Sequence, residues 1–305
     1  MNVEPGLAVA KGHGTENDFV LLPDPEGRLG LDKALVAALC DRRAGLGGDG
    51  VLRLVRCSAE PEAAPMAADA EWFMDYRNAD GSAAQLCGNG LRVFVAYLER
   101  RGWADLSGGR ELAVATRAGV KRVRRDGGLI AADLGPWFIP AGAEGAAAGE
   151  DALVGVRGEP VPLPGLSVDV GNPHVVVALR DVEQLVAADL TRAPLVDPEP
   201  VQGINVELVV PGPVGPDGAH LAMRVHERGV GETRSCGTGA VAAALAARVW
   251  AGADPPSTWW IGVPGGRLRV RVPDGLVLAG SRVELAGPAV IVAEGRLAPE
   301  WLALL

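Results

Sequence analysis

Residues 78–90 of this chain read NADGSAAQLCGNG, and residues 227–239 read ERGVGETRSCGTG. Each stretch has a cysteine, Cys87 or Cys236, nine residues after its first residue, and each cysteine is followed by Gly-X-Gly. An apolar run of helical length comes next in both copies, at residues 91–98 and 240–247. The copies lie close to half the chain length apart in a sequence of 305 residues. The duplication predicts two similar halves, each with a thiol at the start of a helix, and both thiols facing one substrate.

The composition is typical of a globular, loop-rich protein. The chain is 48% hydrophobic, with 42 glycines and 23 prolines, and its length is enough for two domains with buried cores. A net charge of −9 argues against a nucleic-acid partner, because binding phosphates needs a basic surface. The first ten residues lack the basic start of a signal peptide, and residues 240–247 are too few to span a membrane. We therefore expect a cytoplasmic protein without membrane association, whose four cysteines are free thiols.

The expected fold is α+β, with two pseudo-symmetric domains. Each domain should have a mostly antiparallel, barrel-like sheet around one central helix, and the active site is expected in the cleft between the domains. The central helices are the runs after the two cysteines, because a helix that is apolar nearly all round is usually buried. We place the first domain at residues 1–132 and the second at residues 133–285, with a final strand near residues 286–305 returning to the first. Local patterns predict a helix at 32–40, strands at 51–55 and 112–116, a strand–turn–strand at 165–179 and a hairpin loop at 211–218.

A cysteine at the start of a helix is suited to acid–base chemistry. The first helical turn has unpaired N–H groups and the positive end of the helix dipole, which favour a thiolate. The N–H groups of Gly88-Asn89 and Gly237-Thr238 can hold a carboxylate, and glycine lets the backbone approach it closely. A thiolate and a thiol on opposite faces of the neighbouring carbon would move a proton and invert that centre. Such a reaction requires neither a metal nor a cofactor.

Several further motifs resemble those of the diaminopimelate epimerase family. Besides the two cysteine motifs, they are KGHGTENDF at residues 11–19, GNPH at 171–174 and GINV at 203–206, and together they span both halves of the chain. The resemblance implies a PLP-independent interconversion of LL- and meso-diaminopimelate, a step of bacterial lysine and peptidoglycan synthesis. It also implies two pseudo-symmetric domains that close over the substrate, and a homodimer.

The same resemblance implies residue roles. Cys236 is the proton acceptor and Cys87 the proton donor in the LL to meso direction, and the roles exchange in reverse. His174 and Glu227 lie near the thiols and tune their pKa. The expected substrate contacts are Asn17, Asn78, Gly88, Asn89, Asn172, Asn205, Glu227, Arg228, Gly237 and Thr238. These side chains suit a substrate with two ammonium and two carboxylate groups, because amides both donate and accept and arginine grips a carboxylate with two donors.

Other interpretations remain open from the sequence. A proline or hydroxyproline racemase would share the fold and the thiol pair, and a non-catalytic amino-acid-binding module would share the ligand contacts. Each asparagine could instead serve its own turn, and Glu227-Arg228 could be a surface ion pair. The chain also departs from the family at two places. Gly50 stands where many members have a glutamine that approaches the substrate, and Val93 replaces a more usual, non-catalytic cysteine.

Overall fold

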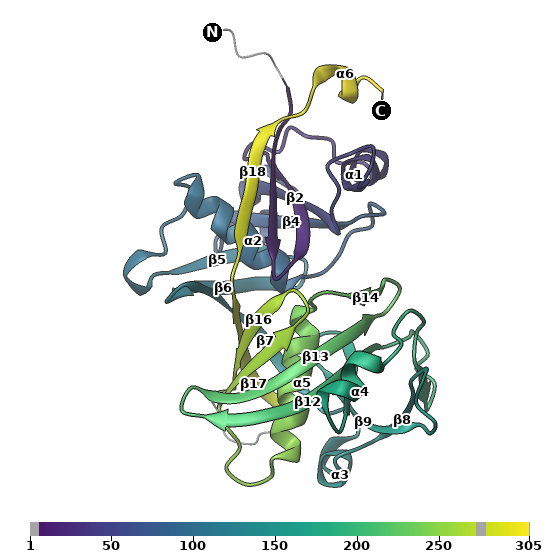
Figure 1. Cartoon of the computed structure of the whole chain (residues 1–305). Coiled ribbons are helices and arrows are strands. Elements are labelled where there is room, and N and C mark those ends of the chain that lie inside the picture. Colours follow the sequence, from purple (N-terminus) through teal and green to yellow (C-terminus); the bar gives the residue numbers. More distant parts are fainter. Residues whose placement is uncertain (1–5, 273–278, 305) are drawn as a thin grey trace. The chain divides into compact units, whose positions relative to one another are not determined.

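The computed structural model describes residues 6–272 and 279–304. The chain forms two compact units (Figure 1). Unit 1 comprises Met1–Ala132 and Gly287–Leu305, and unit 2 comprises Asp133–Ala286. The chain passes from unit 1 to unit 2 within strand β7 (Leu129–Phe138) and returns at the end of strand β17 (Ala279–Gly287).

Unit 1 is a curved sheet around helix α2 (Gly88–Arg100). Its strands, in order of pairing, are β18 (Val290–Arg296), β1 (Ala8–Gly14), β2 (Asn17–Pro23), β3 (Gly50–Arg56), β4 (Trp72–Asn78), β5 (Glu111–Thr116), β6 (Gly119–Asp126) and β7. The β2–β3 and β4–β5 pairs are parallel, and the other pairs are antiparallel. Helix α2 packs against β1, β2, β3, β4 and β18. Helix α1 (Lys33–Cys40) packs against β2 and β3.

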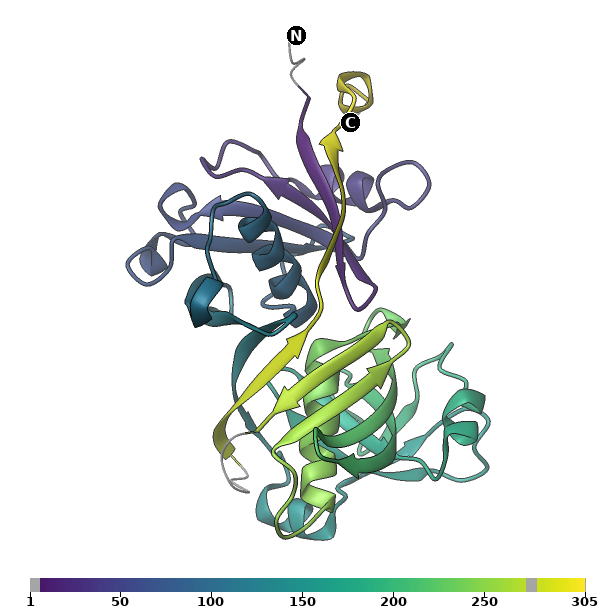
Figure 2. The same cartoon turned by 60° about the vertical axis from the view of Figure 1, so that its left-hand side comes forward.

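Unit 2 repeats this order around helix α5 (Gly237–Trp250). Its barrel strands are β7, β9 (Leu163–Asp169), β10 (Pro173–Ala178), β12 (Asn205–Gly215), β13 (Gly218–Glu227), β15 (Thr258–Val263), β16 (Gly266–Arg271) and β17. The β10–β12 and β13–β15 pairs are parallel. They correspond to the parallel pairs β2–β3 and β4–β5 of unit 1. Strand β17 also pairs with β7, which closes the barrel around α5 (Figure 2). The predicted mixed α+β fold, with a mostly antiparallel sheet around a central helix in each half, is confirmed.

The two units also contain shorter helices and strands outside their main sheets. They are α3 (Gly142–Ala148), β8 (Ala152–Gly155), α4 (Val182–Ala187), β11 (Leu195–Asp197) and β14 (Gly231–Thr233) in unit 2, α6 (Pro299–Leu302) in unit 1, and the 3-10 helices Cys57–Ala59, Ala64–Met66 and Ser107–Gly109 in unit 1. No helix of the described residues is both long and apolar enough to cross a membrane.

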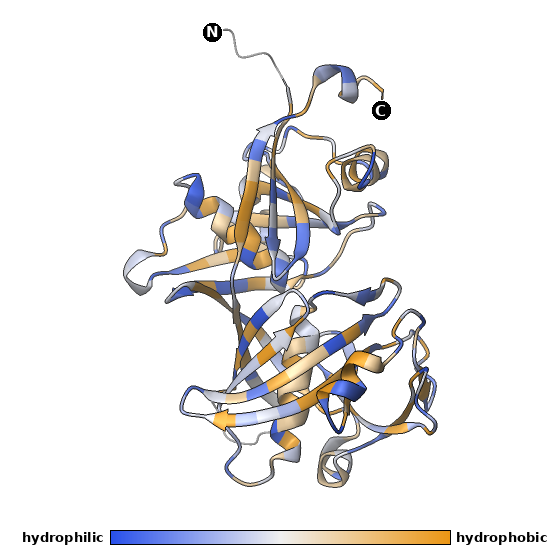
Figure 3. Ribbon diagram, in the orientation of Figure 1, coloured by the Kyte–Doolittle hydropathy of each residue, from blue (hydrophilic) through white to orange (hydrophobic). Residues whose placement is uncertain are grey.

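Both central helices are buried on nearly every side. The sequence of α5 is apolar nearly all round, whereas α2 also buries the polar side chains of Asn89 and Arg92. Helix α5 is rich in alanine and valine, and most of it is pale to orange when coloured by hydropathy (Figure 3). Small side chains let the surrounding strands approach the helix closely. A helix enclosed in this way has a firmly placed N-terminus, which is where each cysteine lies.

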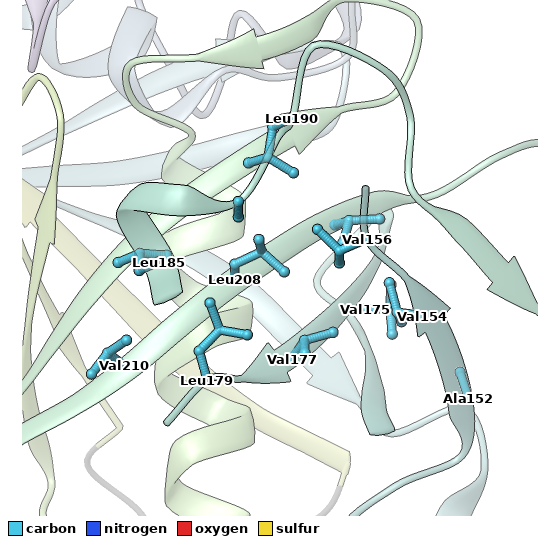
Figure 4. Close-up of a cluster of buried hydrophobic side chains, with 12 residues drawn as sticks. Ala152, Val154, Val156, Val175, Val177, Leu179, Leu185, Leu190, Leu208 and Val210 are labelled. Atoms are coloured by element: carbon cyan, nitrogen blue, oxygen red, sulfur yellow. The ribbon is translucent and has the colours of Figure 1, made fainter. Parts of the chain in front are cut away.

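The outer face of unit 2 has a separate apolar core (Figure 4). Val175 and Val177 of β10 and Val206, Leu208 and Val210 of β12 pack there under α4 and β8. Side chains alternate between the two faces of a strand, so the residues next to these valines and leucines along each strand face α5. His174 and Glu207 are among these inward-facing residues.

Most local predictions agree with the structure. Helix α1 begins after Asp32, whose side chain accepts a hydrogen bond from the Leu35 N–H at 2.8 Å. Strands β3 and β5 contain the two predicted strands, and β9 and β10 form the predicted strand–turn–strand at 165–179.

The hairpin predicted at residues 211–218 is present, but its loop is much shorter than predicted. Strands β12 and β13 continue through it, and only Pro216 and Asp217 form the turn. Strand β12 pairs with β10 only as far as Val209. Beyond Val209 this edge of β12 has no pairing with β10, so the two prolines, which lack a backbone N–H, remove no hydrogen bond between these strands. A register shift between Pro211 and Val214 accommodates the rest.

Candidate active site

Cys87 lies at the N-cap of α2. Its backbone is extended and its Sγ accepts a hydrogen bond from the Gly90 N–H at 3.4 Å. The thiol is half-buried. A sulfur that accepts an N–H at the positive end of a helix is stabilised in its thiolate form. The sequence prediction that the helix begins just after the cysteine is confirmed.

The Cys87 thiol adjoins a network of two amides and a carboxylate. The Cys87 thiol donates to Asn17 Oδ1 at 3.6 Å, and Asn89 Nδ2 donates to the same oxygen at 3.1 Å. Asn17 Nδ2 donates to Asp49 Oδ2 at 2.7 Å, which fixes the amide with its oxygen toward the sulfur. Asn17 opens strand β2, next to the parallel strand that follows Asp49. The structure thus brings together three residues predicted for the site and adds Asp49.

A buried guanidinium lies on the same helix. Arg92 is 0% exposed and donates to the Gly88 carbonyl at 3.2 Å, to Asn89 Oδ1 at 2.8 Å and to the Pro288 carbonyl at 3.4 Å. Burial lowers the pKa of Arg92 to about 10, and the negative charge of the Cys87 thiolate acts in the opposite direction. By reciprocity, the guanidinium stabilises that thiolate.

Cys236 occupies the same position at the N-cap of α5. Its Sγ accepts from the Gly239 N–H at 3.3 Å and lies 3.4 Å from Thr238 Oγ1. Asn172 Nδ2 donates to Thr238 Oγ1 at 3.4 Å. Asn172 and Thr238 therefore take the places of Asn17 and Asn89 in the other unit, but here the hydroxyl of Thr238 is the group that joins the asparagine to the cysteine.

The charges around Cys236 are negative. Burial raises the pKa of the Cys236 thiol well above its ordinary value, and the carboxylates of Glu227 and Glu207 raise it further. Burial also raises the pKa of Glu227, although hydrogen bonds from the Thr233 hydroxyl and the Cys236 thiol oppose that shift. Glu227 is thus a carboxylate in contact with the thiol, with an affinity for protons greater than that of an exposed glutamate.

His174 pairs with a residue that the sequence analysis did not select. Its Nδ1 lies 2.7 Å from Oε1 of Glu207, and both side chains are 0% exposed. Glu207 lies in β12 between Val206 and Leu208, both of which are buried. Glu207 could have been identified from the sequence as a single acidic residue among apolar neighbours, because a buried carboxylate needs a partner.

Three other predicted residues have scaffold bonds. Asn78 Nδ2 donates to Ser82 Oγ at 3.0 Å. Asn205 Nδ2 donates to the Pro173 carbonyl at 2.9 Å, and Asn205 Oδ1 accepts from the Arg228 backbone N–H at 2.9 Å. Arg228 is exposed and its guanidinium donates to the Gln202 carbonyl at 3.1 Å. Asn205 therefore holds together the two segments that present His174 and Arg228.

The departure at position 50 has a steric cause in this chain. A Cβ on Gly50 would lie 2.4 Å from the Arg77 carbonyl oxygen and 2.7 Å from Tyr76 Cε2. Position 50 therefore has no room for a glutamine. In the described part of the chain, no three His, Cys, Asp or Glu side chains gather as they would around a metal ion.

Comparison with known proteins extends over nearly the whole chain. A sequence profile described as diaminopimelate epimerase matches residues 9–137 and 166–282. The chain is similar to the diaminopimelate epimerase of Streptomyces coelicolor, with 50% identity over 97% of each chain. It is also similar to that of Thermobifida fusca, with 48% identity over 95% of this chain and 97% of the relative.

Two solved structures share the fold at low identity. One is a phenazine biosynthesis protein of the PhzF family from Bacillus anthracis, with a TM-score of 0.68, 15% identity and coverage of 97% of this chain and 100% of that one. The other is a hydroxyproline epimerase from Agrobacterium vitis, with a TM-score of 0.60, 15% identity and coverage of 98% of this chain and 94% of that one. The profile and the close relatives show that this chain belongs to the diaminopimelate epimerase family.

Proposed function

We propose that this protein interconverts LL- and meso-2,6-diaminopimelate without a cofactor, with Cys87 and Cys236 acting on opposite faces of one α-carbon. The observation that carries the proposal is the repeated geometry of the two cysteines. Each is the N-cap of a central helix, and the sulfur of each accepts the N–H three residues on. Family membership supports the choice of substrate.

Cys236 is suited to remove the proton in the LL to meso direction. Its thiol first passes its proton to the Glu227 carboxylate, which already accepts a hydrogen bond from it. The resulting thiolate lies among negative charges and away from water, so it is a strong base. It takes the proton from the α-carbon and returns to the thiol form.

Cys87 is suited to supply the new proton. Its thiol is held by Asn17 and the Gly90 N–H, and giving up the proton leaves a thiolate that the Arg92 guanidinium stabilises. The proton moves from Cys87 to the opposite face of the α-carbon, which inverts the centre. After the product leaves, Glu227 gives its proton to water and the Cys87 thiolate takes one from water, which restores the starting state. In the reverse direction the two roles exchange.

The helix N-termini stabilise the charge that develops between these steps. N–H groups of Gly88-Asn89 and Gly237-Thr238 bind the carboxylate next to the reacting carbon, where the carbanion delocalises. The proposed contacts to the rest of the substrate are Asn17, Asn78, Asn172, Asn205, Glu227 and Arg228. Among them, Arg228 has the exposure and the donor geometry to bind the distal carboxylate.

The proposal is tested by incubating the purified protein with LL-diaminopimelate in heavy water, without added PLP. Formation of the meso isomer with deuterium at the inverted α-carbon is expected. L-proline and trans-4-hydroxy-L-proline serve as comparison substrates, because a racemase of that type would turn them over instead. Binding of diaminopimelate without any exchange of the α-hydrogen would refute the epimerase activity and would indicate a non-catalytic binding protein.

The proposal includes a biological setting. We place the protein in the cytoplasm, as a homodimer, in the branch that supplies lysine and peptidoglycan precursors. Sedimentation velocity at micromolar concentration checks the dimer. Growth of a strain lacking its own epimerase, with and without this chain, checks the pathway.

A further inference from the structure

The two barrels have the same register beneath their central helices. Phe19 of β2 pairs with Gly50 of the parallel strand β3, and His174 of β10 pairs with Asn205 of the parallel strand β12. Two residues beyond these partners lie Leu52 in β3 and Glu207 in β12. The pairs Phe19–Leu52 and His174–Glu207 therefore occupy equivalent positions.

Contacts of the helices confirm this equivalence. A Cβ on Gly90 of α2 would lie 3.2 Å from Leu52 and 3.5 Å from Phe19. A Cβ on Gly239 of α5, the same position after its cysteine, would lie 2.5 Å from Glu207 Oε1. One unit thus has two apolar side chains under the cysteine turn, and the other has an imidazole and a carboxylate.

Burying the polar side chains of His174 and Glu207 costs free energy, because both lose their contacts with water. Both side chains are 0% exposed and share one contact of 2.7 Å. Among residues 6–272 and 279–304, His174 Nε2 and Glu207 Oε2 have no hydrogen-bond partner. Since Phe19 and Leu52 fill the equivalent space with no polar atom, a core of this shape does not need the pair. A function for the unpaired Nε2 accounts for the presence of the pair.

We propose that Glu207 is a positioning residue, which binds the Nδ1–H of His174 and so presents Nε2 as a hydrogen-bond acceptor to the active site. A carboxylate on one imidazole nitrogen selects the tautomer and the ring orientation, so the lone pair of the other nitrogen points in one fixed direction. This inference rests on the proposed epimerase function.

Other charged groups near the imidazole do not duplicate this role. Glu227 of β13 acts on His174 through its charge, and its hydrogen bonds come from Thr233 and the Cys236 thiol. Cys236, the N-cap of α5, forms hydrogen bonds with the Gly239 N–H and with the Thr238 hydroxyl. Glu207 is the group that contacts His174 Nδ1 directly.

The first test needs no substrate. In protein labelled with ¹⁵N-histidine, the His174 signals are assigned by their loss in His174→Phe. The wild type should show one tautomer, protonated at Nδ1, and Glu207→Gln should keep it because the amide oxygen still accepts. Glu207→Leu, which introduces the residue found in unit 1, should show a mixture of tautomers. A single Nδ1-protonated tautomer in folded Glu207→Leu would overturn the proposal.

Kinetics with diaminopimelate form the second test. We expect kcat to fall at least about 100-fold in Glu207→Leu and by no more than about tenfold in Glu207→Gln, with KM within about threefold in both. The double variant His174→Phe/Glu207→Leu recreates the Phe19–Leu52 pair and should fold even if Glu207→Leu does not. Its kcat should equal that of His174→Phe, because two residues that act as one unit are not additive.

A control on the same strand isolates the structural contribution. Val209 is the next residue of β12 that faces α5, and Val209→Ala should lower the melting temperature without changing the His174 tautomer. A kcat in Glu207→Leu within about threefold of wild type, or a double variant far slower than His174→Phe, would refute the positioning role. If the wild type did not turn over diaminopimelate at all, the proposed function would fail, and the tautomer result would still decide the role of Glu207.

Discussion

The two cysteine turns share a backbone and differ in charge. Cys87 and Cys236 have the same N-cap bond and an enclosed helix behind them, and an asparagine belongs to the hydrogen-bond network of each. The buried Arg92 cation acts on Cys87, whereas the buried Glu207 carboxylate and the half-buried Glu227 carboxylate act on Cys236. A duplicated scaffold supplies two thiols. The side chains packed against it favour the thiolate of Cys87 and disfavour that of Cys236.

The largest expected effect comes from removing either thiol. Cys87→Ala and Cys236→Ala should each lower the rate of inversion by about 10³-fold or more, because one face then lacks its acid or base. In Cys87→Ala the LL isomer should still exchange its α-hydrogen with heavy water, through Cys236, but with retained configuration. Mass spectrometry combined with chiral chromatography measures exchange and inversion separately. Inversion at near wild-type rate in either variant would contradict the two-base mechanism.

Arg92→Met removes the cation from one turn only. The free energy of unfolding should fall by about 2–4 kcal/mol, because buried carbonyl and amide oxygens lose their donor. Alkylation of Cys87 by iodoacetamide at pH 7.5 should slow by about tenfold, since fewer molecules hold the thiolate.

Cys236 is the internal control for Arg92→Met. Peptide mapping after timed alkylation reports both cysteines in one sample, and the rate at Cys236 should not change. Equal slowing at both cysteines would mean that the substitution loosens the whole protein, and that the electrostatic contrast is wrong.

The raised pKa of Cys236 predicts a loss of stability at alkaline pH. The unfolded chain gives up this proton near the ordinary value of 9.0, while the folded protein keeps it. The unfolded state therefore binds fewer protons, and the free energy of unfolding falls with rising pH by up to about 1.4 kcal/mol per unit above pH 9. Cys236→Ala should lack this contribution, and Cys87→Ala should keep it.

Urea unfolding at a series of pH values between 7.5 and about 10.5 measures the difference. Cys40, whose pKa burial raises to about 11, contributes equally in both variants and cancels. The same pH dependence in Cys236→Ala and in the wild type would contradict the assignment.

The smallest expected effect concerns the glycine three residues after each cysteine. In Gly239→Ala the new methyl would lie 2.5 Å from Glu207 Oε1, so the carboxylate must shift and kcat should fall by about three- to tenfold. In Gly90→Ala the nearest atom is 3.2 Å away on Leu52, and the loss should be smaller. Both substitutions favour the helix by up to about 1 kcal/mol, so melting temperatures should change little. A greater loss of kcat in Gly90→Ala than in Gly239→Ala would reverse the comparison.

Much of the site was visible in the sequence because it is local. Cys87 and Cys236 could be placed at helix starts from the glycines and apolar runs that follow them, and Asp32 could be recognised as a cap for the same reason. The loop predicted at residues 211–218 was too long because the strand depends on its distant partners. Prolines and glycines usually mark a loop, but here β12 tolerates them because its edge is open beyond Val209.

The sequence by itself determined the duplicated fold, the two thiols and the family, because these depend on short motifs and their spacing. Only the tertiary structure decided which charges act on each thiol. Glu207 reaches His174 because β10 and β12 pair in parallel in one register, and Arg92 is isolated from water because the strands enclose α2. The register of β10 with β12 and the burial of α2 depend on packing between segments far apart in the chain, so no local sequence pattern predicts them.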